Sequence, residues 1–488
     1  MLTGSVNTVW LYVSGGIAFV VALAFGWSVA YKAREYLPVP VRLLRGLSWY
    51  LPVALFGYAV VSLSVNVPVW DDYDALLSYL ALPGNARVSH VFDFHNEHRI
   101  AIVRGVAELV MLAGGGVFDF RGMICVGNLI ALAYAFLLVR KLPPAWGAAF
   151  LWAFLSLLTY ENMLWALTAV QSNAVLFFAW VSLFCLERAQ WISCGTGVSL
   201  KAGLLFSGVL VSAVFCTLTS GSGLFIWPCL GLFLVGHWWQ EKTDRVARAT
   251  FPIWRLACVV LVGAIVWGLY LRGMPPSGNA EGEPVWRHPF TALAYGIVFC
   301  GGIAHFLPLA CLAGVCVVAA VVYVLPKFRQ CRDQTTLCFL LFLLCAAGSA
   351  TLFRSSFGIE QALSFRYRVI AVSIAWCCCV LLNERWSGQW DSLIRWGSAG
   401  FTFCCVFLNL AAYFIGYPLL AERRDNLMAG IRKWPEISAD LSYPSNRLDH
   451  ADGILKECAV RGIWRLSGHE EVDGKKEIRR EIESGLRE

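Results

Sequence analysis

The chain has 488 residues, of which 58% are hydrophobic and 15% charged, and its mean hydropathy is +0.63. A soluble domain exposes far more charge, so this composition excludes an ordinary soluble globular protein. The formal net charge of +7 does not indicate a nucleic-acid partner, because Lys and Arg in so apolar a chain mostly mark cytoplasmic loops.

Long apolar runs predict a polytopic integral membrane protein of the all-α class. Each run has about 17 to 22 residues, enough to cross ~30 Å of hydrocarbon. We expect about twelve helices, at residues 9–31, 48–69, 121–139, 145–160, 168–186, 203–219, 222–237, 256–271, 305–325, 336–353, 367–383 and 397–417. The run at 9–31 lacks a basic leader and a small-residue cleavage site, so we interpret it as a retained helix. The transmembrane domain is then 1–418, and a polar extracytoplasmic tail follows at 419–488.

The 18 cysteines give no metal or disulfide signal. Most lie inside apolar runs, as Cys377-Cys378-Cys379 does, and there a thiol behaves as a small hydrophobic group. No CxxC pair with metal-ligand spacing falls in a polar loop, so we expect neither a zinc site nor a disulfide framework.

The distribution of basic residues sets the expected topology. They fall in alternate connections, at 32–45, 140–141, 242–255, 327–332 and 385–395. All of these connections are cytoplasmic under the positive-inside rule. The loop 70–120, the remaining connections and the tail then lie on the extracytoplasmic side.

Residues 97–112 form either a further span or an amphipathic helix. Arg104 and Glu108 lie one turn apart on the face of Glu97, while valines occupy the other face. We favour a helix lying in the membrane interface. A further span would place Arg140 and Lys141 on the outer side, against the positive-inside rule.

The stretch "WDDYD" opens the first outer loop, where Asp71, Asp72 and Asp74 follow directly on a span. Acidic residues at such a place can simply cap a helix. A carboxylate at the membrane face can also act as a general base. Asp72-Tyr73-Asp74 has the Asp-x-Asp form that can hold a divalent cation such as Mg or Mn. Both interpretations stay open.

The same loop carries the dense polar run His95-Asn96-Glu97-His98-Arg99. It is either a polar loop that anchors the amphipathic helix or a substrate-binding element, because an Arg with His neighbours can bind phosphate. The His-x-x-His spacing lacks the further ligands that a metal site needs.

Polar residues recur at 159–173, "TYENMLWALTAVQSN". Glu161 and Asn162 lie at a helix junction, and Gln171 and Asn173 lie just inside the next span. Polar groups at membrane depth are costly, so they either line a cavity and bind substrate or pair with one another.

The segment "RSSFGIEQALSFRYRV", 354–369, places basic residues on the outer side. This opposes the positive-inside bias, and an anionic partner such as a lipid-linked phosphate explains it better than anchoring by Tyr and Arg does. The candidate substrate-binding residues here are Arg354, Glu360, Gln361, Arg366, Tyr367 and Arg368.

All four clusters face one side of the membrane. A carboxylate loop opposite an Arg-bearing loop is what glycosyl transfer from a lipid-phosphate donor requires. The carboxylate takes the proton of the acceptor hydroxyl, and the arginines stabilise the departing phosphate.

These features resemble the GT-C superfamily of polytopic membrane glycosyltransferases, which use polyprenyl-phosphate-linked sugars. The resemblance covers most of 48–418 and rests on "WDDYD", "HNEHR", "YENMLW" and the late "FGIEQALSFRYR" element. It implies a GT-C-like fold and a catalytic or metal-binding role for Asp71 and Asp72. It also implies that Arg366 and Tyr367 lie near the donor phosphate, with further candidates Arg354, Arg368 and Asp74.

The chain departs from that superfamily in two ways. The usual His-Pro-Pro run after the acidic loop is replaced by "HNEHR", and the segment 9–31 is additional. The Trp-Trp-Asp-type motif of oligosaccharyltransferases is absent too. The resemblance therefore implies a bacterial inner-membrane enzyme that adds a sugar, with inversion, to a cell-envelope glycan such as O-antigen or to a lipid acceptor.

Two other classes of function stay open. A transporter or flippase of lipid-linked glycans would also have about twelve spans, although such proteins typically carry mid-membrane ionisable groups and repeated halves. A non-enzymatic assembly protein would use the outer loops and the tail to bind a partner. Membrane lipids are partners in every case.

Overall fold

The computed structural model describes residues 39–142, 144–196, 200–243, 253–275, 285–326, 331–386, 391–434 and 441–465. The predicted span at 9–31 and residues 466–488 of the predicted tail lie outside these ranges. Within them the chain is helical almost throughout, and its one sheet is the two-stranded hairpin of β1 and β2.

The first half of the chain contains α2 (Val39–Leu63), a π-helical turn (Tyr73–Leu77), α3 (Ser78–Ala81), α4 (Gly84–His90), β1 (Phe94–His95), β2 (His98–Arg99), α5 (Ala101–Ala113), α6 (Phe120–Val139), α7 (Pro144–Phe154), α8 (Tyr160–Leu164), α9 (Ala166–Thr196) and α10 (Leu200–Thr217). The second half contains α11 (Ile226–Thr243), α12 (Ile253–Leu271), α13 (Pro289–Cys300), α14 (Leu307–Val324), α15 (Gln334–Arg354), α16 (Arg368–Trp386), α17 (Asp391–Lys433) and α18 (Leu448–Val460). Short 3-10 turns, among them Leu157–Thr159, Ser355–Phe357, Ile359–Leu363 and Phe365–Tyr367, join several of these helices.

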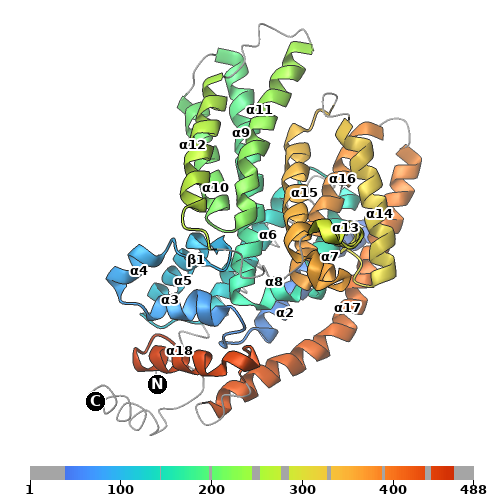
Figure 1. Cartoon of the computed structure of the whole chain (residues 1–488). Coiled ribbons are helices and arrows are strands. Elements are labelled where there is room, and N and C mark those ends of the chain that lie inside the picture. The colour runs from blue at the N-terminus through green and yellow to red at the C-terminus, as the bar shows by residue number, and fades with distance from the viewer. Residues whose placement is uncertain are drawn as a thin grey trace.

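Ten helices in the described part of the chain are long and apolar enough to cross a membrane. They match ten of the predicted spans, so the expectation of an all-α, multi-pass membrane protein is confirmed at that level. Figure 1 shows α9 to α12 as one group of helices and α13 to α17 as a second group beside it.

The predicted span at 145–160 is wrong as a single helix. Helix α7 ends at Phe154 after 11 residues, too short for ~30 Å of hydrocarbon. The freed backbone groups find partners: Asn409 of α17 donates to the Trp152 carbonyl, and the Ser156 hydroxyl accepts from the Leu158 amide. Irregular backbone inside a bundle is tolerated when its polar groups are satisfied in this way.

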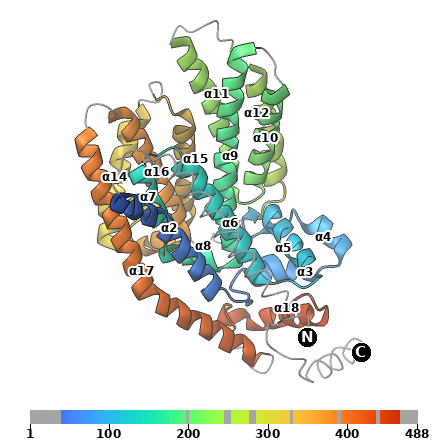
Figure 2. The same ribbon diagram turned by 180° about the vertical axis from the view of Figure 1, so that it is seen from behind.

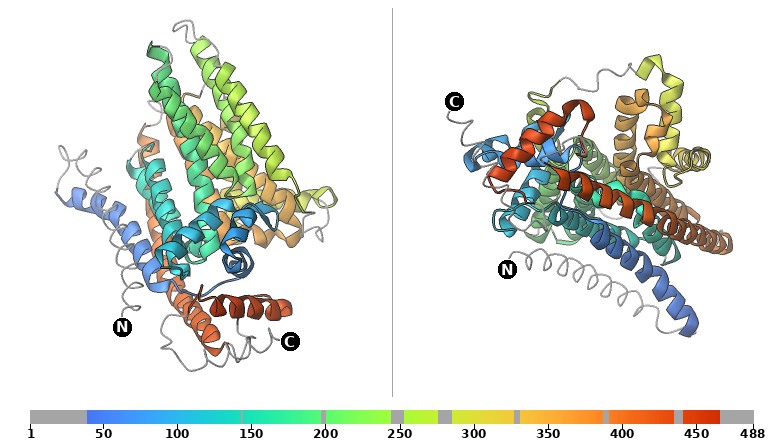
Figure 3. Two further views of the ribbon diagram at one scale, coloured as in Figure 1. Left: turned by 90° about the vertical axis from the view of Figure 1, so that its left-hand side faces the viewer. Right: turned by 90° about the horizontal axis from the view of Figure 1, so that it is seen from below.

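The outer loop and the C-terminal segment lie together at one end of the bundle. Figure 2 and the view from below in Figure 3 show α18 lying under α3 and α5, at the end of the long α17. Residues 419–433, which we assigned to the tail, continue α17 through Pro418. Residues 441–465 then pack into a hydrophobic cluster with the outer loop, through side chains that include Ile454, Leu455 and Trp464.

Helix α5 begins at Ala101, so Glu97 precedes it rather than sharing its polar face. With 13 residues it is too short to be a further span. Its Arg104 is buried and donates to the backbone carbonyls of His90, Val91 and Asp93. The predicted polar face is therefore directed into the outer loop, and its position in a membrane interface stays a prediction.

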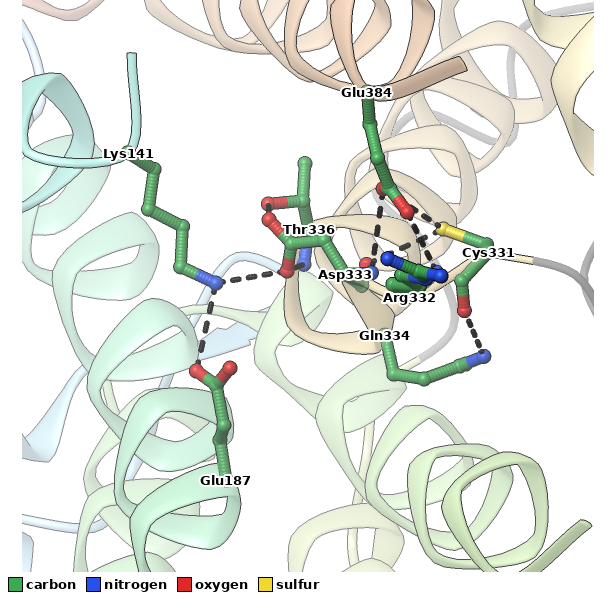
Figure 4. Close-up of polar contacts among 8 residues, drawn as sticks. All are labelled: Lys141, Glu187, Cys331, Arg332, Asp333, Gln334, Thr336 and Glu384. Carbon is green, nitrogen blue, oxygen red and sulfur yellow. Dashed lines mark hydrogen bonds and ion pairs between the residues drawn. The ribbon is translucent and has the colours of Figure 1, made fainter. Parts of the chain in front are cut away.

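The opposite end of the bundle is held by a set of charged contacts (Figure 4). Lys141, just after α6, lies 3.4 Å from Glu187 of α9 and 2.8 Å from Asp333. Asp333 caps α15 by accepting from the Thr336 amide. Glu384 near the end of α16 accepts from the Arg332 amide. These contacts place the connections after α6 and between α14 and α15 at the same end, as the charge pattern predicted.

Helices α6 and α9 touch at Gly127, and this contact generates a test. We expect Gly127→Ala to lower the melting temperature, because the added Cβ would lie 2.5 Å from the Ala169 carbonyl carbon. Forcing extra atoms into such a contact costs about 1–3 kcal/mol. The measurement is heat treatment of the detergent-solubilised protein followed by size-exclusion chromatography.

The matched control is Gly203→Ala on α10, where an added Cβ meets nothing within 4 Å. We expect its melting temperature to equal or exceed that of the wild type. Equal melting temperatures for the two variants would contradict the close contact.

Candidate active site

The acidic turn, residues 69–77, has an unusual backbone. Trp70 has a φ of 50°, a left-handed conformation that is uncommon for a non-glycine residue. Residues Tyr73–Leu77 then form one π-helical turn, an element that occurs often at functional sites. Asp71 and Asp72 lie between Trp70 and the π-helical turn, and these two features together fix the directions of both side chains.

Asp72 is buried and acts as a structural carboxyl group. Its Oδ2 accepts from the Val69 amide at 3.1 Å, and its Oδ1 accepts from the Leu167 amide at 3.0 Å. Leu167 is in the first turn of α9, where amides have no partner within the helix. Burial raises the pKa of Asp72 to about 8, although the two backbone amides favour the charged form.

Asp71 has the opposite environment, because 40% of its side chain is exposed. Burial opposes its ionisation, but contact with His95 and the positive charges of Arg366 and Arg354 outweigh burial. The pKa of this carboxyl group therefore lies below its usual range. Its Oδ1 is 3.9 Å from the His95 Nε2, too far for a hydrogen bond, so the contact is electrostatic.

The hairpin of β1 and β2 places the residues of the polar run on two opposite faces. His95 pairs with His98, and Phe94 pairs with Arg99; paired residues lie on the same side of a sheet. The turn residue Asn96 has a φ of 51°, which Asn tolerates better than most residues. His95 and His98 consequently share the face that meets Asp71 and its neighbours.

Arg99, expected to bind substrate, has a structural environment. Its Nε donates to the Tyr270 carbonyl at 2.8 Å, and its terminal nitrogens donate to the carbonyls of Phe92 and Arg272. Its guanidinium also lies 4.0 Å from the centre of the Phe94 ring. These contacts fasten the hairpin to the end of α12.

Glu97 and His98 join the hairpin to α15 and to the turn before α11. The Arg354 Nη2 donates to the Glu97 Oε1 at 2.9 Å. The Gly221 amide donates to the His98 Nδ1 at 3.3 Å, which leaves the ring proton on Nε2, 3.8 Å from Glu97. Burial lowers the pKa of His98, and the positive charge of Arg354 adds to this effect while Glu97 opposes it.

Arg366 is positioned by α8, which holds its backbone from two sides. Glu161 accepts from the Arg366 amide at 3.1 Å and from the Ser364 hydroxyl. Asn162 donates to the Arg366 carbonyl at 2.8 Å. Glu161 and Asn162 thus hold the late Arg-bearing segment, and Asn162, which the sequence indicates only as a polar residue at a helix junction, is a positioning residue.

The guanidinium of Arg366 has no carboxylate partner among the residues that the structure describes. Its Nε is buried and makes no hydrogen bond there, and its Cζ lies 5.3 Å from the centre of the Tyr367 ring. A buried guanidinium nitrogen without an acceptor is costly. Arg366 therefore has hydrogen-bonding capacity that no residue in the described ranges takes up and that an anion could use.

The remaining candidates divide into structural and unassigned residues. Arg368 is buried and donates to the carbonyls of Gly302 and Ile303 after α13. Gln361 accepts from the Tyr295 hydroxyl and donates to the Tyr367 hydroxyl at 3.5 Å. The exposed Glu360 and the half-buried Gln171 form no hydrogen bond or ion pair with the other candidate residues within the ranges that the structure describes.

Asp74 and Asp72 do not fit a shared divalent cation. The oxygens of Asp72 accept the two backbone amides described above, and those of Asp74 accept from the Tyr443 hydroxyl and the His450 Nε2, each at 2.7 Å. In the described ranges, no three His, Cys, Asp or Glu side chains converge as a metal site.

Tyr443 and His450 are contacts that sequence reasoning missed. They lie about 370 residues from Asp74 along the chain, in a segment whose composition suggested only a polar tail. The alternation of Leu441 and Tyr443, followed by the apolar face of α18, was the available signal.

In comparisons with models of known protein families, with curated proteins and with solved structures, no match was found.

The unlike environments of the two adjacent aspartates generate a stability test. We expect Asp72→Ala to lower the melting temperature strongly, because two amides, one of them at the start of α9, lose their acceptor. Each unpaired buried amide costs about 1–3 kcal/mol. Asp71→Ala serves as the comparison, since within the described part of the chain its half-exposed side chain accepts no backbone hydrogen bond. Equal losses in thermal melts of the purified variants would refute the division of roles.

The raised pKa of Asp72 generates a test of pH dependence. The unfolded carboxyl group loses its proton near its ordinary pKa of 3.8, whereas the folded one keeps its proton up to about pH 8. The unfolded state therefore binds fewer protons between these values, and the contribution of Asp72 to stability falls as pH rises. We expect the melting-temperature advantage of wild type over Asp72→Asn to shrink from pH 5 to pH 8. A constant difference would contradict the raised pKa.

Proposed function

We propose that this protein is a membrane glycosyltransferase, which transfers a sugar from a polyprenyl-phosphate-linked donor to a cell-envelope glycan or lipid acceptor. One observation carries the proposal: a half-exposed carboxylate, Asp71, lies 3.9 Å from His95 and within electrostatic range of Arg354 and Arg366, at one end of a bundle of membrane-length helices. The resemblance of the "WDDYD" and "FGIEQALSFRYR" elements to the GT-C superfamily supports it. The inner-membrane location and the outward-facing site are parts of the same proposal.

Asp71 serves as the general base in the proposed reaction. It accepts the proton of the acceptor hydroxyl while that oxygen forms a bond to C1 of the donor sugar. The bond between C1 and the phosphate oxygen breaks, and the phosphate leaves with the electron pair. One displacement of this kind inverts the configuration at C1. A general base contributes typically 10²–10⁴-fold to such a rate.

The arginines act on the leaving phosphate. Arg366 supplies hydrogen bonds that no described side chain takes up, and a charge-assisted bond to phosphate is about twice as strong as a neutral one. Arg354 adds positive charge from a position fixed by Glu97. Charges that are already oriented stabilise the developing negative charge without reorganisation.

The proposal is tested by mass spectrometry of cell-envelope glycans from strains that produce wild type, Asp71→Asn, Arg366→Gln or no protein. We expect a sugar mass that is present with the wild type and absent without the protein. Asp71→Asn should reduce the modified fraction by at least about 100-fold, in line with loss of a general base. Arg366→Gln should reduce it strongly as well.

Two matched controls remove charge elsewhere. Asp93→Asn removes a carboxylate of the same loop that pairs with the exposed His90, and Arg461→Gln removes a guanidinium, just after α18, that pairs with Glu457. Both should modify glycans as the wild type does. Full modification by Asp71→Asn, at an equal protein level, would refute the enzymatic role and favour the transport of lipid-linked glycans.

A further inference from the structure

The third aspartate of the acidic turn is held from the far end of the chain. The two oxygens of Asp74 accept from Tyr443 and from His450, each at 2.7 Å. The rings of Tyr73 and Tyr443 also meet edge to face, with their centres 5.1 Å apart. The residues that bind Asp74 thus come from the segment before α18 and from its first turn.

The C-terminal segment, residues 441–465, holds the acidic turn at two further places. The Trp70 amide donates to the Ser442 carbonyl at 2.9 Å, and the Cys458 thiol donates to the Leu77 carbonyl at 3.6 Å. Contacts therefore exist at the start, middle and end of the turn. Trp70 is the residue with positive φ, so its strained conformation is stabilised by a bond from outside the turn.

The segment that makes these contacts is itself firmly attached. The Phe118 amide donates to the Ile463 carbonyl at 2.6 Å, and Asn66 donates to the Arg465 carbonyl at 2.9 Å. Leu455 and Cys458 are fully buried against the outer loop. A firmly attached segment can impose a conformation on the turn, whereas a loose one would only follow it.

We propose that Tyr443 and His450 are positioning residues for the acidic turn, and that through Asp74 they set the direction of the Asp71 carboxylate. Asp71 lies between Trp70, whose strained backbone needs external support, and Asp72, whose side chain is fixed on α9. Without the hydrogen bonds from Tyr443 and His450 to Asp74, Trp70 can relax to an ordinary backbone conformation and turn Asp71 away from the arginines. The catalytic consequence rests on the proposed function, but the positioning itself does not.

The test uses the full chain in lipid nanodiscs and compares wild type with Tyr443→Phe, His450→Leu and His450→Gln. Hydrogen–deuterium exchange of the amides in 70–77 reports the hold on the turn, and the Trp70 amide reports it directly. We expect Tyr443→Phe and His450→Leu to exchange at least about tenfold faster there. His450→Gln keeps a side-chain N–H donor and should restore slow exchange, because the donor rather than the ring is required.

The same variants are scored for glycan modification in cells, at matched protein levels. Loss of modification in Tyr443→Phe and His450→Leu, with rescue in His450→Gln, supports the positioning role. Lys456→Gln on the same helix is the control, since its side chain pairs with Asp452. Unchanged exchange at 70–77 in Tyr443→Phe and His450→Leu would overturn the proposal, and so would faster exchange with full modification. If the wild type adds no sugar, the proposed function fails, and the exchange result alone decides the positioning.

Discussion

The carboxyl group of Asp72 is the constraint on which the site depends. It joins the Val69 amide to the Leu167 amide, and so attaches the acidic turn to the start of α9. Helix α9 packs against both α6 and α10, so the position of the acidic turn is fixed relative to these helices. Because neighbouring residues in a turn point in different directions, Asp72 is buried while Asp71 stays half-exposed beside His95, within electrostatic range of Arg354 and Arg366.

A second constraint is the satisfaction of backbone groups where helices break inside the bundle. Between α7 and α9 the chain is irregular, and three buried asparagines supply donors to its carbonyls and to those of neighbouring helices. Asn128 donates to the Met163 carbonyl, and Asn173 donates to the Asn162 carbonyl. Asn162 in turn donates to the Arg366 carbonyl. The polar residues that maintain the break therefore also set the position of the proposed phosphate-binding arginine.

The apolar runs made the spans predictable, since length and hydropathy are local properties that one sequence displays. The same rule of length and hydropathy failed at 145–160. An apolar run does not reveal that Asn409, on a distant helix, donates a hydrogen bond to a backbone carbonyl at the end of α7. The predicted topology alone placed four of the site residues together, because all of them lie in connections at one end of the bundle: Asp71, His95, Glu97 and Arg354. Which of two adjacent aspartates is buried did not follow, because that depends on an amide contributed by α9, 95 residues later.

The structural roles found for Arg99, Arg368 and Asp74 have one physical cause. A charged side chain at the edge of a membrane bundle must find partners, and long-range backbone carbonyls or distant side chains supply them without any trace in the local sequence. Composition can therefore indicate where charged groups gather, but only the fold distinguishes a group with partners from one that still has capacity for a ligand. Arg366 is in the second class and Arg99 is in the first.

The two ends of the bundle differ in a way that bears on mechanism. At the end opposite the site, Lys141 is neutralised by Glu187 and Asp333, and these contacts join α6, α9 and α15. A protein that alternates its access would have to separate such charges in each cycle, at a cost that rises as water is excluded. At the site end, by contrast, Asp71 is ionised and Arg366 has no carboxylate partner in the described ranges. Ion pairs that join helices at one end, and a carboxylate near an arginine with unused donors at the other, support the proposed reaction at a single face over transport through the bundle.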